Sequence, residues 1–283
     1  MRTDPVFRGG TPQDHRIAGG FDVPLQRRYL TGVHRTFADL PEADLTDADL
    51  TNANLRGADL TGASLRGADL THANLGHADL GGANLTRANL TGANLTSADL
   101  PRANLTEAGL TRADLTRANL TEAGLTRADL SYANLTNATL TRAKLSNANL
   151  HKMFLIQTNL SEADLTRADL SYAILTEADL TRADLSYANL SHAALTGAKL
   201  SNANLRDAKL DGAKLGDANL TGTNLVSVSG LATLPAGATW NRGTRWPRHL
   251  APLARDASDE IEAGVFRVRA DPSDDREHEP HFS

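Results

Sequence analysis

The side chains through which this chain could act in catalysis are those of aspartate, serine and histidine. Its 283 residues include no cysteine. The lack of cysteine excludes a thiol nucleophile, a disulfide framework and a cysteine-ligated metal. Aspartate and serine are abundant, but they recur at fixed positions of a short repeat, so no Ser–His–Asp set can be assembled. His278 and His281 lie in a charged tail, where a solvated segment is a simpler interpretation than a metal site. We therefore expect no enzyme activity, no cofactor and no metal site.

A leucine occupies every fifth position from Leu40 to Leu225, which makes 38 consecutive units without an insertion or a deletion. An alanine lies two residues before the leucine in 35 of these units, and the exceptions are Met153, Thr158 and Thr223. Aspartate or asparagine mostly separates the alanine from the leucine, and threonine or serine mostly follows the leucine. The repeated unit is therefore A-[D/N]-L-[T/S]-x.

A five-residue period fits neither an α-helix nor a flat strand. Five residues advance an α-helix by about 140° beyond a full turn, so the leucines would scatter around its circumference. In a strand, alanine and leucine share one face, but the odd period would turn the next pair to the opposite face. The chain must therefore bend once in every unit, at Asn, Asp, Gly, Ser or Thr residues that tolerate corners. Such a pattern predicts a solenoid, whose coils stack through backbone hydrogen bonds.

The unit A-[D/N]-L-x-x resembles the repeat of the pentapeptide-repeat protein family, and the resemblance covers residues 38–227. It implies an all-β fold, a right-handed quadrilateral parallel β-helix in which four units form one coil. The 38 units would then give about nine to ten coils. The chain divides accordingly into an N-terminal cap with a loose start (1–37), the β-solenoid (38–227), and a C-terminal cap segment with a disordered tail (228–283).

The number of units per coil can be tested against the charges. Two pairs of tandem copies repeat at 15 residues, for example PRANLTEAGLTRADL followed by TRANLTEAGLTRADL. Taken alone, these copies favour three units per coil. A 15-residue coil would stack Arg112 on Arg127, however, and like charges directly opposite destabilise a sheet. A 20-residue coil gives a column of alternating charge that contains Arg102, Glu122, Arg142, Glu162 and Arg182. We therefore interpret 20 residues as the structural period and the 15-residue copies as a trace of gene duplication.

The segment after the last repeat contains both tryptophans, Trp240 and Trp246, together with Leu231 and Leu234. An open end of a β-solenoid exposes unpaired strands and needs a cap. We expect the tryptophans to cover the last coil. The end of the chain, 271–283, is rich in charged residues and proline, and we expect it to be disordered.

Charge is unevenly distributed, although the whole chain carries only −5 and has a pI of about 6.0. Residues 38–100 hold nine acidic and three basic side chains, a net charge of −6. Residues 101–160 hold four acidic and seven basic ones, a net charge of +3. The acidic surface of the first coils consists of Asp39, Asp44, Asp49, Asp59, Asp69, Asp79 and Asp99.

The stretch HKMFLIQTNL, residues 151–160, departs most from the repeat. Phe154 and Ile174 replace the usual Asp or Asn one coil apart, and Ile156 adjoins them. Adjacent exposed apolar groups generally mark contact surfaces. A local packing adjustment around the inward Met153 explains them equally well. The candidate interface, with a homodimer as one use of it, consists of Phe154, Ile156, Ile174 and Ala194.

A neighbouring column alternates cations with aromatic rings. Nucleic-acid sites combine such groups, but cation–π stacking within the column explains it as well, and we favour that structural interpretation. The column contains Arg112, Tyr132, Lys152, Tyr172 and His192.

Some pentapeptide-repeat proteins resemble duplex DNA in width and charge and bind type II topoisomerases. The resemblance therefore implies a non-catalytic DNA mimic that binds and modulates or protects DNA gyrase or another type II topoisomerase through the acidic coils. The basic middle of the chain departs from that pattern, because a groove built for phosphates requires an acidic ligand. The alternative is a rigid protein–protein interaction scaffold without topoisomerase activity. Under both hypotheses we expect the protein to be cytoplasmic, because neither a signal segment nor a membrane-spanning apolar run is visible. We also expect it to bind neither membranes nor nucleic acid directly.

Overall fold

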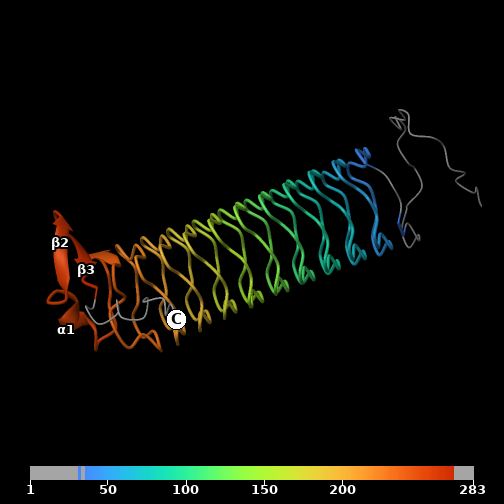
Figure 1. Cartoon of the computed structure of the whole chain (residues 1–283). Helices are drawn as coiled ribbons and strands as arrows, with labels where there is room; N and C mark the ends of the chain where they lie inside the picture. Colours follow the sequence, from blue (N-terminus) through green and yellow to red (C-terminus); the bar gives the residue numbers. More distant parts are fainter. Residues whose placement is uncertain (1–30, 33–35, 271–283) are drawn as a thin grey trace, which may run out of the picture.

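The structure is a computed structural model that describes residues 31–32 and 36–270. The repeats form one continuous shaft, and a small folded unit follows at its C-terminal end (Figure 1). Isolated parallel bridges join residues 20 positions apart along the shaft, such as Asp39 with Asp59 and Asp59 with Asp79. Twenty residues contain four units, so each coil has four sides and four corners. The 20-residue period predicted from charge stacking is thereby confirmed.

Each corner is a β-turn that the alanine N–H closes by donating to the carbonyl of the preceding leucine, as Ala53 does to Leu50 at 2.9 Å. The residue before the alanine has a positive φ, between 53° and 61° where it is not glycine, as in the third position of a type II turn. This position carries arginine, glutamate, histidine and tyrosine as well as asparagine and glycine. The corners were predicted at small polar residues, and the structure differs because hydrogen bonds between coils hold the strained residue. Arg102 N–H, for example, donates to the Thr121 carbonyl at 2.9 Å.

Hydrogen bonding explains why Asp or Asn separates the alanine from the leucine. Its backbone N–H donates to the preceding coil and the leucine N–H donates to the following coil, as Asp59 does to Ala38 (2.8 Å) and Leu60 does to Asp79 (2.7 Å). Its side-chain Oδ1 accepts the N–H of the residue after the leucine, as in the 2.9 Å bond from Thr61 to Asp59. This Asx turn pairs a corner N–H that lies outside both backbone ladders.

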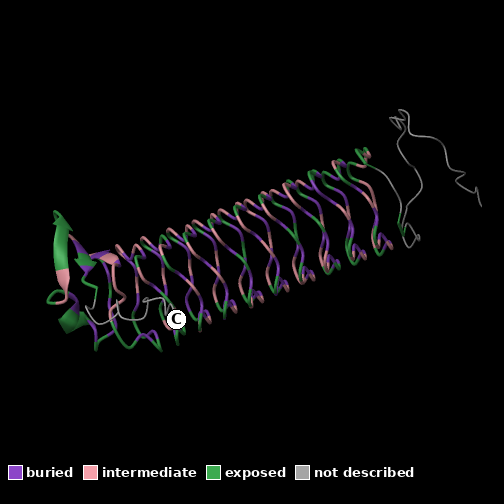
Figure 2. Ribbon diagram, in the orientation of Figure 1, coloured by how far each residue is buried: buried purple, intermediate pink, exposed green. Residues whose placement is uncertain are grey.

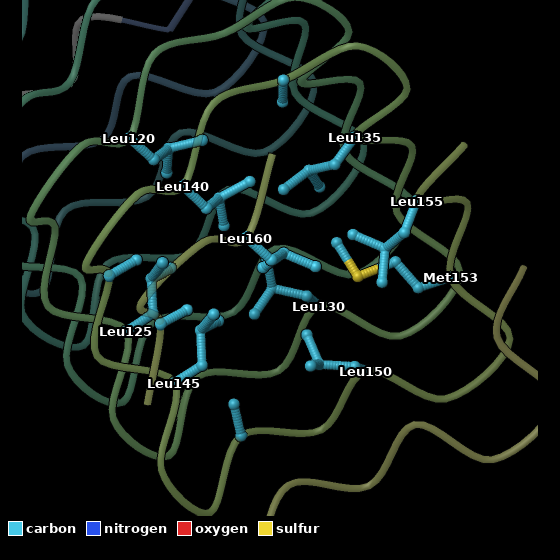
Figure 3. Packing of buried hydrophobic residues seen from close by; sticks show 14 of the residues in the cluster. Leu120, Leu125, Leu130, Leu135, Leu140, Leu145, Leu150, Met153, Leu155 and Leu160 are labelled. Carbon is cyan, nitrogen blue, oxygen red and sulfur yellow. The ribbon is translucent and has the colours of Figure 1, made fainter. Parts of the chain in front are cut away.

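The interior of the shaft is a column of alanine and leucine side chains with almost no solvent exposure (Figure 2). The labelled leucines and Met153 point into the coil (Figure 3). Thr158 and Thr223, which replace alanine, are 0% exposed, and their hydroxyls donate to the carbonyls of Leu135 and Leu200 at 2.7 Å. Because these buried hydroxyls are paired, they avoid the desolvation cost of an unpaired polar group. The shaft interior therefore serves stability, and the surface is left for binding.

The C-terminal unit contains β1 (Thr239–Asn241), α1 (Ala251–Ala254), β2 (Ser258–Glu262) and β3 (Val265–Val268). Its strands form an antiparallel sheet in the order β1-β3-β2. The first of them, β1, also continues the shaft, because Thr239 forms a parallel bridge with Asn219.

An aromatic cluster forms the core of this unit. Trp240 stacks on Phe266 with ring centroids 4.7 Å apart and meets Trp246 edge-on at 6.0 Å. Both tryptophans are buried, and Trp240 Nε1 donates to the Ser258 hydroxyl at 2.9 Å. The predicted N-terminal start as far as residue 30 and the predicted disordered tail, 271–283, lie outside the described residues.

Candidate functional site

Four of the predicted acidic residues form one line along a single face of the first coils, which we call the acidic line: Asp39, Asp59, Asp79 and Asp99. Successive parallel bridges join them, and all four are exposed. Adjacent coils are about 4.8 Å apart, so the four carboxylates span about 14 Å. None of the ion pairs found in the described part of the chain involves any of the four. Within the described residues, the four carboxylates of the line therefore have no ion-pair partner.

The acidic line also performs the local task of an Asx turn. Asp79 Oδ1 accepts the Gly81 N–H at 2.9 Å. The hydroxyl and N–H of Thr61 both donate to Asp59 and lower the pKa of that carboxyl, which keeps it charged. The two flanking corners carry small residues at Gly57, Gly62, Gly82 and Ser97, and longer side chains at Phe37, Glu42, His77 and Arg102.

The remaining predicted acidic residues do not join this line. Asp49 forms a bridge with Asp69 on one other face, and Asp44 forms a bridge with Ser64 on another. The hydroxyl and N–H of Thr51 lower the pKa of Asp49. The seven predicted residues are thus distributed over three faces, and only the acidic line brings four of them together.

The acidic line ends where a ladder of alternating charge begins. Asn119 occupies the next place in the line and donates to Asp99 at 2.6 Å. On the adjacent corner, Arg102 pairs with Glu122 at 2.8 Å, and the Arg102 hydrogen bond is the largest cause of the lowered pKa of Glu122. We call this the Arg–Glu ladder, and it continues through Arg142, Glu162 and Arg182. The predicted alternation is confirmed, as it is in a second column with Arg87, Glu107 and Arg127.

The candidate apolar interface lies on a different face, in the middle of the shaft. Phe154, Ile174 and Ala194 follow one another through parallel bridges, and Ile156 lies at the adjoining corner. Phe154 is 42% exposed, whereas Ile156, Ile174 and Ala194 are partly buried. The structure therefore brings the four predicted residues together.

Phe154 and Ile174 have no Oδ1 with which to form the Asx turn. Within the described residues, no side chain accepts the N–H of Ile156 or of Thr176, the positions that Asp or Asn serves elsewhere in the shaft. Apolar residues at these two places therefore do not contribute the Asx turn that Asp or Asn forms elsewhere in the shaft.

The cation–aromatic column lies at the corner beside this apolar face. Lys152 Nζ lies 5.6 Å from the ring centroid of Tyr132 and 5.8 Å from that of Tyr172, and His192 stacks on Tyr172 at 4.7 Å. These contacts confirm cation–π stacking within the column. Sequence reasoning treated the column and the apolar residues separately and missed His151, whose ring packs edge-on between the two tyrosines. The sequence did carry a signal that the two columns form one surface, because each member of the cation–aromatic column precedes a member of the apolar column by two residues.

Across the part of the chain that the structure describes, no cluster of three or more His, Cys, Asp or Glu side chains has an arrangement that could hold a metal ion. A search of the same residues finds no helix with the length and hydropathy to span a bilayer.

The geometry agrees with comparisons with known proteins. The family model for pentapeptide repeats matches in eight copies, which together run without a gap from residue 29 to residue 226. The chain therefore belongs to the pentapeptide repeat family, and its shaft is a right-handed quadrilateral β-helix. Members of this family are generally structural or binding proteins.

One solved structure supports the same fold, and a second is also matched. HetL, a pentapeptide repeat protein involved in heterocyst differentiation regulation from the cyanobacterium Nostoc sp. strain PCC 7120, matches with a TM-score of 0.67 and 38% identity, over 75% of this chain and 91% of HetL. QnrB1, a plasmid-mediated fluoroquinolone resistance protein, matches with a TM-score of 0.33 and 17% identity, over 72% of this chain and 94% of that structure. A search of curated proteins finds no significant match.

Proposed function

We propose that this chain is a non-catalytic binding protein whose acidic line docks on the DNA-binding surface of another protein, and that this partner is DNA gyrase or another type II topoisomerase. The observation that carries the proposal is the row formed by Asp39, Asp59, Asp79 and Asp99, which is exposed and has no compensating cation among the described residues.

The spacing of the row suits a groove built for nucleic acid. One strand of duplex DNA carries a charge about every 3.4 Å along its axis, and the acidic line carries one about every 4.8 Å. Lysine and arginine side chains that bind phosphates would meet carboxylates at a similar linear density. The rigid stacking of coils holds these carboxylates in place before binding, so little ordering cost remains.

The basic middle of the shaft confines this contact to its first coils. Residues 101–160 carry a net charge of +3, which a phosphate-binding groove would repel. A binding role also suits the regulatory involvement of HetL, which shares 38% identity with this chain. The proposal places the protein in the cytoplasm, where such a partner acts on DNA.

A supercoiling assay tests the proposal. We expect micromolar wild-type protein to change gyrase supercoiling, or to change cleavage in the presence of a quinolone. A variant with Asp39→Asn, Asp59→Asn, Asp79→Asn and Asp99→Asn should lose the effect. The variant should fold, because the shaft already contains a stacked asparagine row at Asn54, Asn74 and Asn94. Unchanged supercoiling and cleavage with the wild-type protein would overturn the proposal.

The alternative is a protein–protein interaction scaffold without topoisomerase activity, and one observation favours it. Phe154 is 42% exposed and stacks on Ile174 at positions where the fold gains from a polar residue. The two functions separate experimentally, because the acidic line and this apolar face occupy different faces of the shaft. A scaffold would tolerate the four aspartate changes and would lose its partner after changes at Phe154 and Ile174.

A further inference from the structure

The face that contains Phe154 consists of three parallel columns, which together we call the dimer face. The central column is joined by parallel bridges and runs through Asp114, Asn134, Phe154, Ile174, Ala194 and Lys214. One flanking corner is the cation–aromatic column, from Arg112 to His192, which ends beside Asp211. The other flanking corner contains Arg117, Asn137, Gln157, Glu177, Gly197 and Asp217.

We propose that the dimer face binds the same face of a second copy of this chain, in an antiparallel homodimer. Its two-fold axis would lie across the face, midway between the coils of Phe154 and Ile174. In this arrangement each column meets itself in reverse order, as an isologous interface requires. Phe154 of each copy then packs against Ile174 of the other, and Lys152 meets Tyr172.

Charge complementarity supports this arrangement. Five coil spacings separate the two ends of the face, about 24 Å. Across the axis Asp114 meets Lys214, while Arg112 meets the corner of Asp211 and Arg117 meets Asp217. Opposite charges therefore face each other in all three columns, at both ends of the interface.

These six end charges are available for such contacts. All six are exposed: Arg112, Asp114, Arg117, Asp211, Lys214 and Asp217. None of them takes part in an ion pair within the described chain, in contrast to the neutralised Arg–Glu ladder. Arg112 does lie over the ring of Tyr132, with 5.9 Å from its guanidinium carbon to the ring centroid.

The axis position is specific. Moving it by half a coil, onto the coil of Phe154, would place Lys152 against Lys152 of the second copy and would separate all three charge pairs. Moving it half a coil the other way would place Glu177 against Glu177. Like charges in direct contact across an interface oppose association, so one register is favoured.

The expected dimer is weak. The apolar centre contains only four exposed or partly exposed side chains, whereas a standard interface buries roughly 800 Å² per partner. The end charges supply register and salt dependence more than affinity. The acidic line lies on the neighbouring face, so this dimer leaves it accessible, and the inference does not depend on the proposed function.

Sedimentation of purified protein over a concentration series tests the apolar centre. The double change Phe154→Asn and Ile174→Asn should raise the dimer dissociation constant more than tenfold without lowering the melting temperature, because asparagine restores the Asx turn. Tyr187→Asn is the matched control, since Tyr187 is 53% exposed on another corner, and it should leave association unchanged. A wild-type protein that stays monomeric at several hundred micromolar overturns the inference, as does an equal effect of the control.

A charge exchange tests the orientation. Asp114→Lys should weaken the dimer several-fold, and adding Lys214→Asp should restore it. Because these two residues lie about 24 Å apart in one chain, rescue can come only from contact between copies. A double variant that associates no better than the single one would exclude the antiparallel register.

Crosslinking provides an independent readout, because the natural chain has no cysteine. A variant with both Asn134→Cys and Ala194→Cys should form covalent dimers with a bis-maleimide that spans the roughly 10 Å between packed sheets. Either single change should leave monomers, because identical positions would lie about 14 Å apart along the axis. Equal crosslinking of single and double variants would contradict the proposal.

Discussion

Two neighbouring stretches of the shaft treat charge in opposite ways. In the first coils, the acidic line stacks four carboxylates with no compensating cation among the described residues. From Arg102 onward, the Arg–Glu ladder on the adjacent corner alternates its signs, with contacts of 2.8 Å at two of its pairs. The coil pattern is the same in both stretches, and the interior of each is mostly buried alanine and leucine, with Met153 and Thr158 in place of alanine beside the Arg–Glu ladder. The same backbone therefore accommodates either arrangement of surface charge.

Removal of the C-terminal unit would expose the last coil of the shaft. Truncation after residue 229 deletes the buried Trp240 and Trp246 and leaves the last coil with unpaired backbone groups. We expect end-to-end association or aggregation, measured by light scattering, as the largest effect among these predictions. A truncated protein that remains monomeric and melts at the wild-type temperature would show that the tryptophans do not protect the coil.

Equivalent core changes in the two stretches should have equal effects. Leu65→Ala in the acidic stretch and Leu145→Ala beside the Arg–Glu ladder each remove a side chain that is at most 1% exposed. Each should lower the unfolding free energy by about 2–5 kcal/mol, because the cavity adds to the lost transfer term. Denaturant unfolding measures both, and a large difference between them would mean that the surface charges alter the stability of the coils beneath.

The pH dependence of stability tests the contribution of the arginine–glutamate pairs. Salt bridges to arginine lower the folded pKa of Glu107, Glu122 and Glu162. A lowered carboxylate pKa gives stability above the unfolded value, which is lost as the pH falls through the folded value. We therefore expect the melting temperature to fall below about pH 4.5, the ordinary value for glutamate. Glu122→Gln should make that fall shallower, and an unchanged profile would show that the ladder contributes nothing.

The smallest expected effect is on the stability of the acidic line itself. Replacing its four aspartates with asparagine keeps the Asx acceptors and removes repulsion between adjacent coils. We expect the melting temperature to stay the same or rise by about 1–4 °C. Thermal melts at low salt measure this, and a clear decrease would mean that the carboxylates stabilise the coils.

Particular residues show how much of the fold could be predicted from the sequence. The alternation of Arg102, Glu122 and Arg142 sufficed to predict the coil period, because stacked charges report directly on register. The side chains that tolerate positive φ were not predictable, since hydrogen bonds from adjacent coils override local preference. The antiparallel strands β2 and β3 were not predicted either, because their short sequences fall outside the repeat.

Less of the candidate site than of the fold could be predicted from the sequence. Composition identified the acidic residues, but their separation into one line and two other faces required the coil geometry. The sequence also identified Phe154 and Ile174, yet their loss of the Asx turn became visible only once the hydrogen bonds were known. The complementarity of the dimer face depends on three columns read together in reverse, which a linear repeat does not display.

The central claim is that the acidic line is a binding surface rather than a requirement of the fold. Equilibrium binding of DNA-free gyrase should be compared for the wild type, the fourfold acidic-line variant, and a matched variant with Asp129→Asn, Asp164→Asn, Asp169→Asn and Asp184→Asn. Both variants change the net charge by the same amount and remove the same kind of side chain. The account predicts that only the acidic-line variant loses binding and that wild-type binding weakens with added salt. Equal binding by both variants, or no binding by the wild type, would contradict it.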